Sequence, residues 1–196
     1  MNDQTPDNAP GNYPNLADSD LVGEVWPIAQ PGEDPVLYGH VDFEPKGKFP
    51  VRSYQSFRLT YTVGRYGLDD TGAIRVGFRI HGDAGGLQTD DPTQPNYVTA
   101  RTDTGVPLNV DYIRRAAGTR PRWKTLTVRV TGGCLREGDT ITIVFGDTSG
   151  GSPGMKMQTF VESAMEFKVS ADVCAVGHFV PIPGTPYVSI VPDVPA

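Results

Sequence analysis

Short runs of alternating apolar and polar residues, separated by glycine and proline, constrain the fold of this chain more than any other feature. In residues 55–63 (QSFRLTYTV), every second residue is apolar: Phe57, Leu59, Tyr61 and Val63. Successive side chains of a β-strand point to opposite faces, so this pattern predicts a strand with one buried face. The pattern recurs at 74–80, 124–130, 140–145, 165–169, 178–182 and 187–191.

These runs predict an all-β fold. The chain of 196 residues contains 23 glycines and 18 prolines, and they fall between the runs as turn formers. We therefore expect an antiparallel β-sandwich, Ig-like or jelly-roll in class, with about eight strands and two long irregular loops, 81–106 and 146–157. We expect residues 21–196 to form the single sandwich domain, whereas residues 1–20 have almost no β-branched or aromatic content and are expected to be flexible.

Three local expectations complete this fold. Residues 64–73 (GRYGLDDTGA) predict a hairpin connection between the first two runs. Residues 109–117 (NVDYIRRAA) are the best candidate for a helix, of about two turns. Prolines within 178–182 and close to 187–191 indicate edge strands, since proline cannot donate a ladder hydrogen bond.

Charge and composition exclude several classes of partner. The net charge of −6 repels phosphate backbones and anionic lipid, so we expect neither nucleic acid nor membrane as a partner. The N-terminus has no basic stretch followed by an apolar one, which predicts a cytoplasmic protein without a Sec signal peptide. In that compartment Cys134 and Cys174 are expected to be free, buried thiols rather than a disulfide.

Residues 146–151 (GDTSGG) resemble the Gly-Asp-Ser-Gly-Gly stretch around the nucleophile of chymotrypsin-like proteases. Ser149 is therefore a candidate nucleophile, with His81 and Asp111 preceding it in the chymotrypsin order. The inserted Thr148 displaces this serine relative to the oxyanion-hole amides, and the Ala-Ala-His-Cys context of the family's histidine is absent. A glycine-rich loop after a strand is the favoured interpretation, and an autonomous serine hydrolase stays as the weakest alternative.

The spacing of the other polar residues does not match a metal-binding motif. The three histidines are scattered and no Cys-x-x-Cys occurs, so we predict no metal site and no cofactor in this chain. Asp90 and Asp91 lie in the longest loop, and we assign them to a binding or interface surface. Tyr97, Tyr112, Arg122 and Trp123 could form a platform for a sugar ring, which gives a second hypothesis: a stand-alone module that binds carbohydrate or a similar polar ligand.

Several separated motifs resemble one bacterial family. These motifs are GDTSGGSPGMKMQTFVESAMEFKV from residue 146, VGHFVPIPGTP, LTYTVGRYGLDDTGAIRVGFRI and DDPTQPNYVTARTDTG. They are similar to the β-rich region of a family of uncharacterised bacterial proteins in which a sandwich-like segment precedes a PHP-type (polymerase and histidinol phosphatase) metal-hydrolase domain. The similarity spans roughly residues 55–190. Family members continue into a barrel with a His-x-His motif, whereas no His-x-His occurs in this sequence.

The resemblance implies an accessory role. We expect a chain that is not catalytic alone and that packs on a separately encoded PHP-type barrel subunit of a hydrolase or lyase, which would carry the divalent metal. In this hypothesis the loops shape the partner's active site through Asp147, Lys156 and Gln158, together with the loop residues Asp90, Asp91 and Tyr97. A homo-oligomer is the other assembly that exposed strand edges favour.

Overall fold

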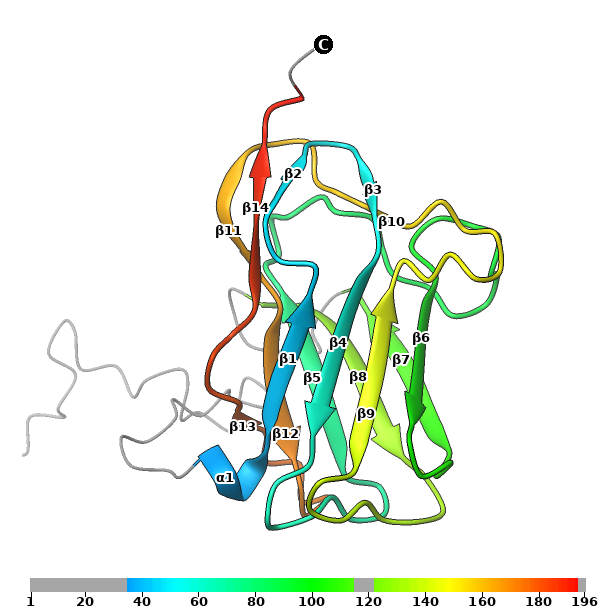
Figure 1. The fold of residues 1–196 in the computed structure, drawn as a ribbon, viewed down its shortest axis with the longest axis vertical. Coiled ribbons are helices and arrows are strands. Elements are labelled where there is room, and N and C mark those ends of the chain that lie inside the picture. The colour runs from blue at the N-terminus through cyan, green and yellow to red at the C-terminus, as the bar shows by residue number, and fades with distance from the viewer. Residues whose placement is uncertain (1–34, 115–121, 194–196) are drawn as a thin grey trace, which may run out of the picture.

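Two β-sheets packed face to face form the body of the molecule, as expected for an antiparallel β-sandwich (Figure 1). The computed structural model describes residues 35–114 and 122–193. The predicted flexible segment 1–20 lies outside the described residues. One short helix, α1 (Pro35–Tyr38), precedes the first strand.

The front sheet has four strands in the order β1-β4-β9-β6, all antiparallel. Its strands are β1 (His40–Glu44), β4 (Phe57–Thr62), β9 (Thr140–Phe145) and β6 (Val98–Thr102). The back sheet has five strands in the order β13-β12-β5-β8-β7, also antiparallel. Its strands are β13 (Val180–Pro181), β12 (Lys168–Asp172), β5 (Ala73–Phe78), β8 (Lys124–Val130) and β7 (Leu108–Ile113).

Smaller sheets extend the sandwich at one end, drawn uppermost in Figure 1. One has the order β11-β14-β2, formed by β11 (Glu162–Glu166), β14 (Tyr187–Val191) and β2 (Lys48–Pro50). The other pairs β10 (Met155–Lys156) with β3 (Tyr54–Gln55). The β14–β2 pairing is parallel and departs from the antiparallel expectation. It also places β14 between two neighbours, so the prediction of an edge position for 187–191 is wrong, whereas β13 does lie at an edge.

Alternation along the strands decides which side chains form the core. Phe57, Leu59 and Tyr61 of β4 are fully buried, as are the alternating apolar residues of β8 and β9. Phe167, between β11 and β12, contacts aromatic rings of both sheets: Phe43, Phe57 and Phe145 from the front sheet and Phe78 from the back sheet. These rings fill the space between the front and back sheets at the end next to the smaller sheets.

The predicted helix at 109–117 is wrong, because residues 108–113 form strand β7. Leu108, Val110 and Tyr112 pack against the core while the residues between them are exposed. This period of two places one apolar face on the sandwich, which outweighs the helical preference of the Arg and Ala that follow. Residues 115–117 lie outside the described part of the chain.

The predicted hairpin at 64–73 is also wrong. β4 belongs to the front sheet and β5 to the back sheet, so the connection crosses between the sheets. Leu68 exchanges two backbone hydrogen bonds of 2.8 Å with Leu135 of the loop before β9. Both leucines are buried and cover the core at this end. The connection therefore contributes to core packing, although its glycines and aspartates indicate only a turn.

Two further expectations need correction. Cys134 and Cys174 are free, as predicted, but both are exposed rather than buried. The long loop 81–106 contains strand β6, and the loop 146–157 ends in strand β10. Fourteen strands occur in the described ranges, more than the expected eight, because several have only two or three residues and carry no visible alternation.

Candidate functional site

The loop 88–97 is organised around Gln88. The Gln88 side-chain oxygen Oε1 accepts the backbone N–H groups of Asp90 and Asp91, both at 2.9 Å. Asp91 Oδ1 accepts hydrogen bonds from the backbone N–H and the hydroxyl of Thr93, at 2.9 and 2.7 Å. These bonds hold the pKa of Asp91 below its ordinary value. The Asp91 carboxylate therefore stabilises its own turn, and Asp90 is exposed beside it.

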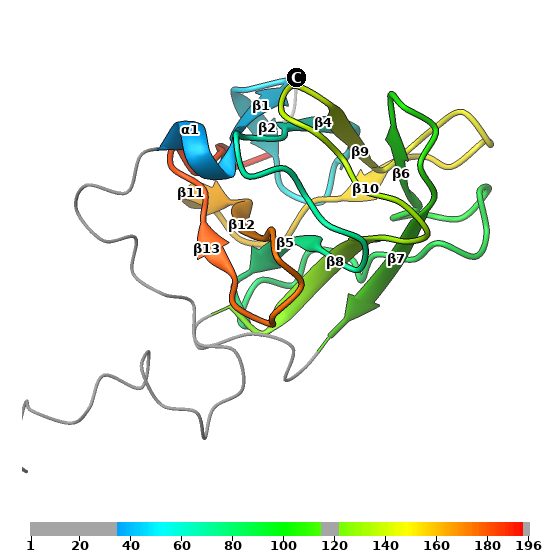
Figure 2. The same ribbon diagram turned by 90° about the horizontal axis from the view of Figure 1, so that it is seen from below.

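The loop 146–154 packs directly against this first loop, and the two lie side by side in Figures 1 and 2. Asp147 donates its backbone N–H to Tyr97 O at 2.9 Å, and Asn96 donates its N–H to Gly154 O at 2.9 Å. Gly150 lies so close to Pro92 that an added Cβ would come within 2.4 Å of the proline Cβ. The two loops thus form one structural unit.

The Asp147 carboxylate accepts hydrogen bonds that hold its loop in place. It accepts the Thr99 hydroxyl at 2.6 Å and the Ser149 N–H at 2.9 Å. Burial acts to raise the pKa of Asp147, but these hydrogen bonds outweigh it and the pKa lies below the ordinary value. The predicted shaping role of Asp147 in this loop is consistent with these contacts.

Ser149 and His81 are not brought into contact by any hydrogen bond among the described residues. Ser149 is exposed at the tip of its loop. His81 follows the end of β5, and its ring lies 6.4 Å from the ring of Phe160. A nucleophilic serine of the chymotrypsin type requires a histidine base within hydrogen-bond reach, and His81 does not make that contact with Ser149.

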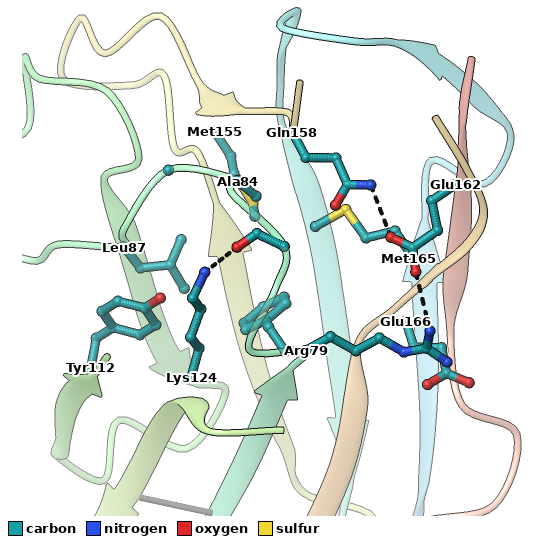
Figure 3. Close-up of a pocket in the computed structure, with 13 residues that line it drawn as sticks. Arg79, Ala84, Leu87, Tyr112, Lys124, Met155, Gln158, Glu162, Met165 and Glu166 are labelled. Carbon is teal, nitrogen blue, oxygen red and sulfur yellow. Dashed lines mark hydrogen bonds and ion pairs between the residues drawn. The ribbon is translucent and has the colours of Figure 1, made fainter. Parts of the chain in front are cut away.

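A pocket lies at the end of the sandwich, between the segment that follows β5 and strand β11 (Figure 3). We name it the end pocket. The cavity itself is small, about 20 Å³, and it opens into a depression whose empty space, including the part open to solvent, is about 420 Å³. Side chains from six separate segments converge on it: Phe78, Arg79, Ala84, Leu87, Tyr112, Lys124, Met155, Gln158, Glu162, Met165 and Glu166, with the backbone of Gly82 and Gly85.

Of the six loop residues assigned to binding or an interface, Gln158 alone lines the end pocket, and Tyr112 of the predicted sugar platform lines it as well. The Gln158 side chain is buried, and its Nε2 donates to Glu162 Oε2 at 2.9 Å and to Phe160 O at 3.2 Å. Lys156 is exposed on β10 and Tyr97 is half-buried in the loop unit, both away from the pocket lining. Gln158, two residues beyond β10, thus reaches the end pocket, whereas Lys156 of β10 does not.

Two carboxylates on one wall of the end pocket, those of Glu162 and Glu166, are each paired with a guanidinium group. Arg79 Nη1 lies 3.6 Å from Glu162 Oε1, and Arg122 Nη2 donates a hydrogen bond to Glu166 Oε2. Arg79 Nε is buried and has no hydrogen-bond partner in the described residues. The Glu162 side chain is 15% exposed, so its charge is poorly solvated and its interaction with Arg79 is stronger than that of a surface pair.

Lys124 forms the opposite wall. Its Nζ donates to the Gly82 carbonyl oxygen, as the dashed line in Figure 3 shows. Burial, and then the positive charge of Arg114, lower the pKa of Lys124, while Asp83 opposes the shift. Burial raises the pKa of the neighbouring Tyr112 hydroxyl. Burial at this wall therefore disfavours the charged form of both side chains.

The sequence analysis missed Arg79, Lys124, Glu162 and Glu166. Each lies at or just beyond a strand terminus, where a charged residue usually signals only solvent exposure. The proposed sugar platform is not formed as expected: Tyr112 lines the end pocket, whereas Arg122 is paired with Glu166. The described residues contain no group of three or more His, Cys, Asp or Glu placed to hold a metal ion.

Comparisons with known proteins give similarities of shape. The sequence matches no protein-family model and no curated protein. A cohesin module from a family 33 glycoside hydrolase of Clostridium perfringens is 9% identical, covering 80% of this chain and 99% of that one, with a TM-score of 0.44. The CBM3a-L domain with flanking linkers from the scaffoldin cipA of the Clostridium thermocellum cellulosome is 16% identical, covering 78% and 96%, with a TM-score of 0.39.

Within the described residues, no helix is both long and apolar enough to cross a membrane.

Proposed function

We propose that this chain is a non-catalytic β-sandwich module and that the end pocket binds a carbohydrate or a similar polyhydroxylated ligand. The observation that carries the proposal is the convergence of hydrogen-bond donors and acceptors from separate strands on one pocket. Binding sites of this kind combine an apolar lining with a few placed polar groups. The end pocket has both.

The chemistry of the lining fits hydroxyl groups. A sugar hydroxyl both donates and accepts, so it can donate to Glu162 or Glu166 while it accepts from Arg79. Tyr112, which is half-buried, offers apolar surface for the C–H face of a ring. Hydrogen bonds to charged groups are the stronger kind, and these side chains are already held in place by each other.

The proposal is tested by retention of the full chain on a panel of immobilised polysaccharides, followed by calorimetry with the best oligosaccharide. The variant Glu162→Gln keeps the shape of the side chain but removes its charge. We expect about tenfold weaker binding or more, since a hydrogen bond to a charged group contributes about 1.5–3 kcal/mol.

The matched control is Glu137→Gln, at an exposed position in the turn before β9. It should bind like the unmodified chain. Absence of retention on every polysaccharide, or equal affinity of the two variants, would contradict the proposal.

A second proposal follows from an exposed apolar surface beside the end pocket. Ile80, Phe160 and Val161 are 39%, 38% and 57% exposed, and Phe160 lies beside His81. Exposed apolar residues next to a pocket are common where another subunit docks. This supports the accessory role, in which the chain packs on a PHP-type metal-dependent barrel and shapes the entrance to its active site.

Mixing the chain with a PHP-type barrel hydrolase tests this role through complex formation on size-exclusion chromatography and a gain in activity. The double variant Phe160→Glu/Val161→Glu should abolish both effects. Val176→Glu, which changes an exposed apolar residue beyond the other end of β12, should preserve them. No complex with the unmodified chain, or loss with the control alone, would refute the accessory role.

A further inference from the structure

Strand β1 has one unpaired edge. It is hydrogen-bonded to β4 along its whole length, from His40 opposite Thr62 to Glu44 opposite Arg58. In the described part of the chain no strand pairs with its other edge. Backbone N–H and C=O groups on such an edge can form a ladder with an additional extended segment.

A groove runs along this edge, between β1 and the chain that leads into β14. We name it the edge groove. Its empty volume is about 1080 Å³, including the part open to solvent. Figure 1 shows β1 and β14 running in the same direction. The groove is lined by Val41, Phe43, Lys46, Gly47, Lys48, Gly184, Thr185, Pro186, Tyr187 and Ser189.

The lining has an apolar floor with an exposed aromatic ring. Val41 is half-buried and Phe43 is buried, because both point from β1 toward the core. Tyr187 is 57% exposed although it belongs to a strand that is paired on both sides further along. An incoming strand would cover this ring and the adjacent Pro186, with every second side chain facing the floor.

The charge of the edge groove selects an acidic occupant. Lys46 and Lys48 line it, both are exposed, and no aspartate or glutamate is among the lining residues. The two acids of β1, Asp42 and Glu44, are exposed and alternate with Val41 and Phe43, so they lie on the opposite face of the strand from the groove floor. Glu44 also lies 3.8 Å from Arg58. Lys168 adds a third ammonium group nearby, since its Nζ donates to the Thr185 hydroxyl at 2.9 Å.

We propose that the edge groove binds an extended acidic segment of a partner protein, which adds a strand to the free edge of β1. Alternate residues of that segment are apolar and face Val41 and Tyr187, and acidic residues at the end of the segment that lies beyond Glu44 face Lys46 and Lys48. Recognition by strand addition draws affinity from the backbone ladder and specificity from the alternating side chains.

The probe is a fluorescein-labelled peptide of alternating valine and threonine that carries two glutamates at each end, titrated into the full chain and followed by fluorescence anisotropy. The same peptide with two lysines at each end is its charge-reversed match. We expect saturable binding of the acidic peptide alone, weakened at least tenfold by the double variant Lys46→Glu/Lys48→Glu and weakened by salt. Lys156→Glu, at an exposed lysine of β10, should leave the affinity unchanged.

Hydrogen exchange distinguishes strand addition from simple attraction to lysines. The acidic peptide should slow amide exchange in β1 and leave β6, the edge strand on the other side of the front sheet, unchanged. Binding without protection of β1, equal binding of both peptides, or no effect of the double variant would overturn the proposal.

The chain itself offers a competing occupant that the test can separate. Residues 1–34 contain five aspartates and two glutamates, seven acids in all, and no lysine or arginine. The same titration is made with the full chain carrying asparagine and glutamine at these seven positions. Binding that appears only in this variant would assign the edge groove to the chain's own segment and overturn the partner proposal.

Discussion

Individual backbone positions decide where the loop unit can form. Gly146 has a φ of 68° and an added Cβ would lie 2.1 Å from the backbone nitrogen of Met155. Gly151 and Gly154 also have positive φ, whereas Gly150 is required for its close approach to Pro92. Glycine is therefore needed here for two separate reasons, backbone conformation and lack of space.

The change Gly146→Ala separates these two reasons when it is compared with Gly138→Ala. Gly138 has a φ of 92° but nothing within 4 Å of an added Cβ. We expect Gly138→Ala to lower the free energy of unfolding by about 1–2 kcal/mol, the cost of a left-handed alanine. Gly146→Ala should cost clearly more in urea denaturation, because the backbone of Met155 must also move; equal losses would contradict this.

Tyr61 gives the core a dependence on high pH. Its hydroxyl is buried and donates to Tyr38 O, and burial raises its pKa well above the ordinary value near 10. The neutral form is therefore favoured in the folded state. This stabilisation is fully present below the pKa of the unfolded state and is lost as pH rises through the folded-state pKa.

The comparison with Tyr61→Phe measures this effect. The variant should lose about 1 kcal/mol at pH 7, the net contribution of a typical hydrogen bond. The stability difference between the two proteins should then shrink between pH 7 and 11 in urea titrations. A difference that stays constant over this range would show that Tyr61 ionises as freely in the folded chain as in the unfolded one.

At the scale of elements, turns are stabilised by side chains that bond across them. Asp147 joins strand β6 to the loop after β9 by accepting from Thr99 and Ser149. Gln88 does the same within its own loop. These contacts explain why loops without regular structure can keep a fixed shape beside the end pocket.

Asp147→Ala should lower the free energy of unfolding by about 1–3 kcal/mol, because it leaves two donors without their charged acceptor. Asp90→Ala is the control, since Asp90 has one long contact, 3.5 Å from the Thr89 hydroxyl, and is exposed. Guanidinium denaturation measures both. Proteolysis within 146–154 should also become faster in Asp147→Ala alone; an equal effect of the control would refute this role of Asp147.

At the scale of the whole molecule, one aromatic residue joins the two sheets. Phe167 is fully buried, and its ring centroid lies 4.7 Å from Phe43, 5.2 Å from Phe78 and 5.3 Å from Phe145. Aromatic pairs at these separations contribute beyond their buried area. The stability of the sandwich and the position of β11, which carries Glu162 and Glu166, therefore depend on the same residue.

Phe167→Ala should cost about 3–5 kcal/mol in the free energy of unfolding, as a large cavity in a core does. Phe160→Ala, at a position 38% exposed, should cost much less. Thermal denaturation followed by circular dichroism compares the two. Similar losses would show that the rings around Phe167 close the cavity and that the contact between the sheets is not specific to it.

Much of the sandwich could be predicted from the sequence because burial on one face of a strand imposes a period of two. β4, β5, β8, β9 and β14 were all located from that period alone. The glycines of GDTSGG likewise indicated a loop. The period of two failed for strands of two or three residues, such as β2 and β10, which are too short for an alternation to appear.

Tertiary structure alone decided which strands are neighbours and which charges meet. The crossing of 64–73 between the sheets depends on Leu68 pairing with Leu135, a contact between residues far apart in the chain. The end pocket likewise unites Arg79, Lys124 and Glu162 from distant segments. Alternation specifies the face of a strand, but it carries no information on the identity of the neighbouring strand, and a binding site is built from that neighbourhood.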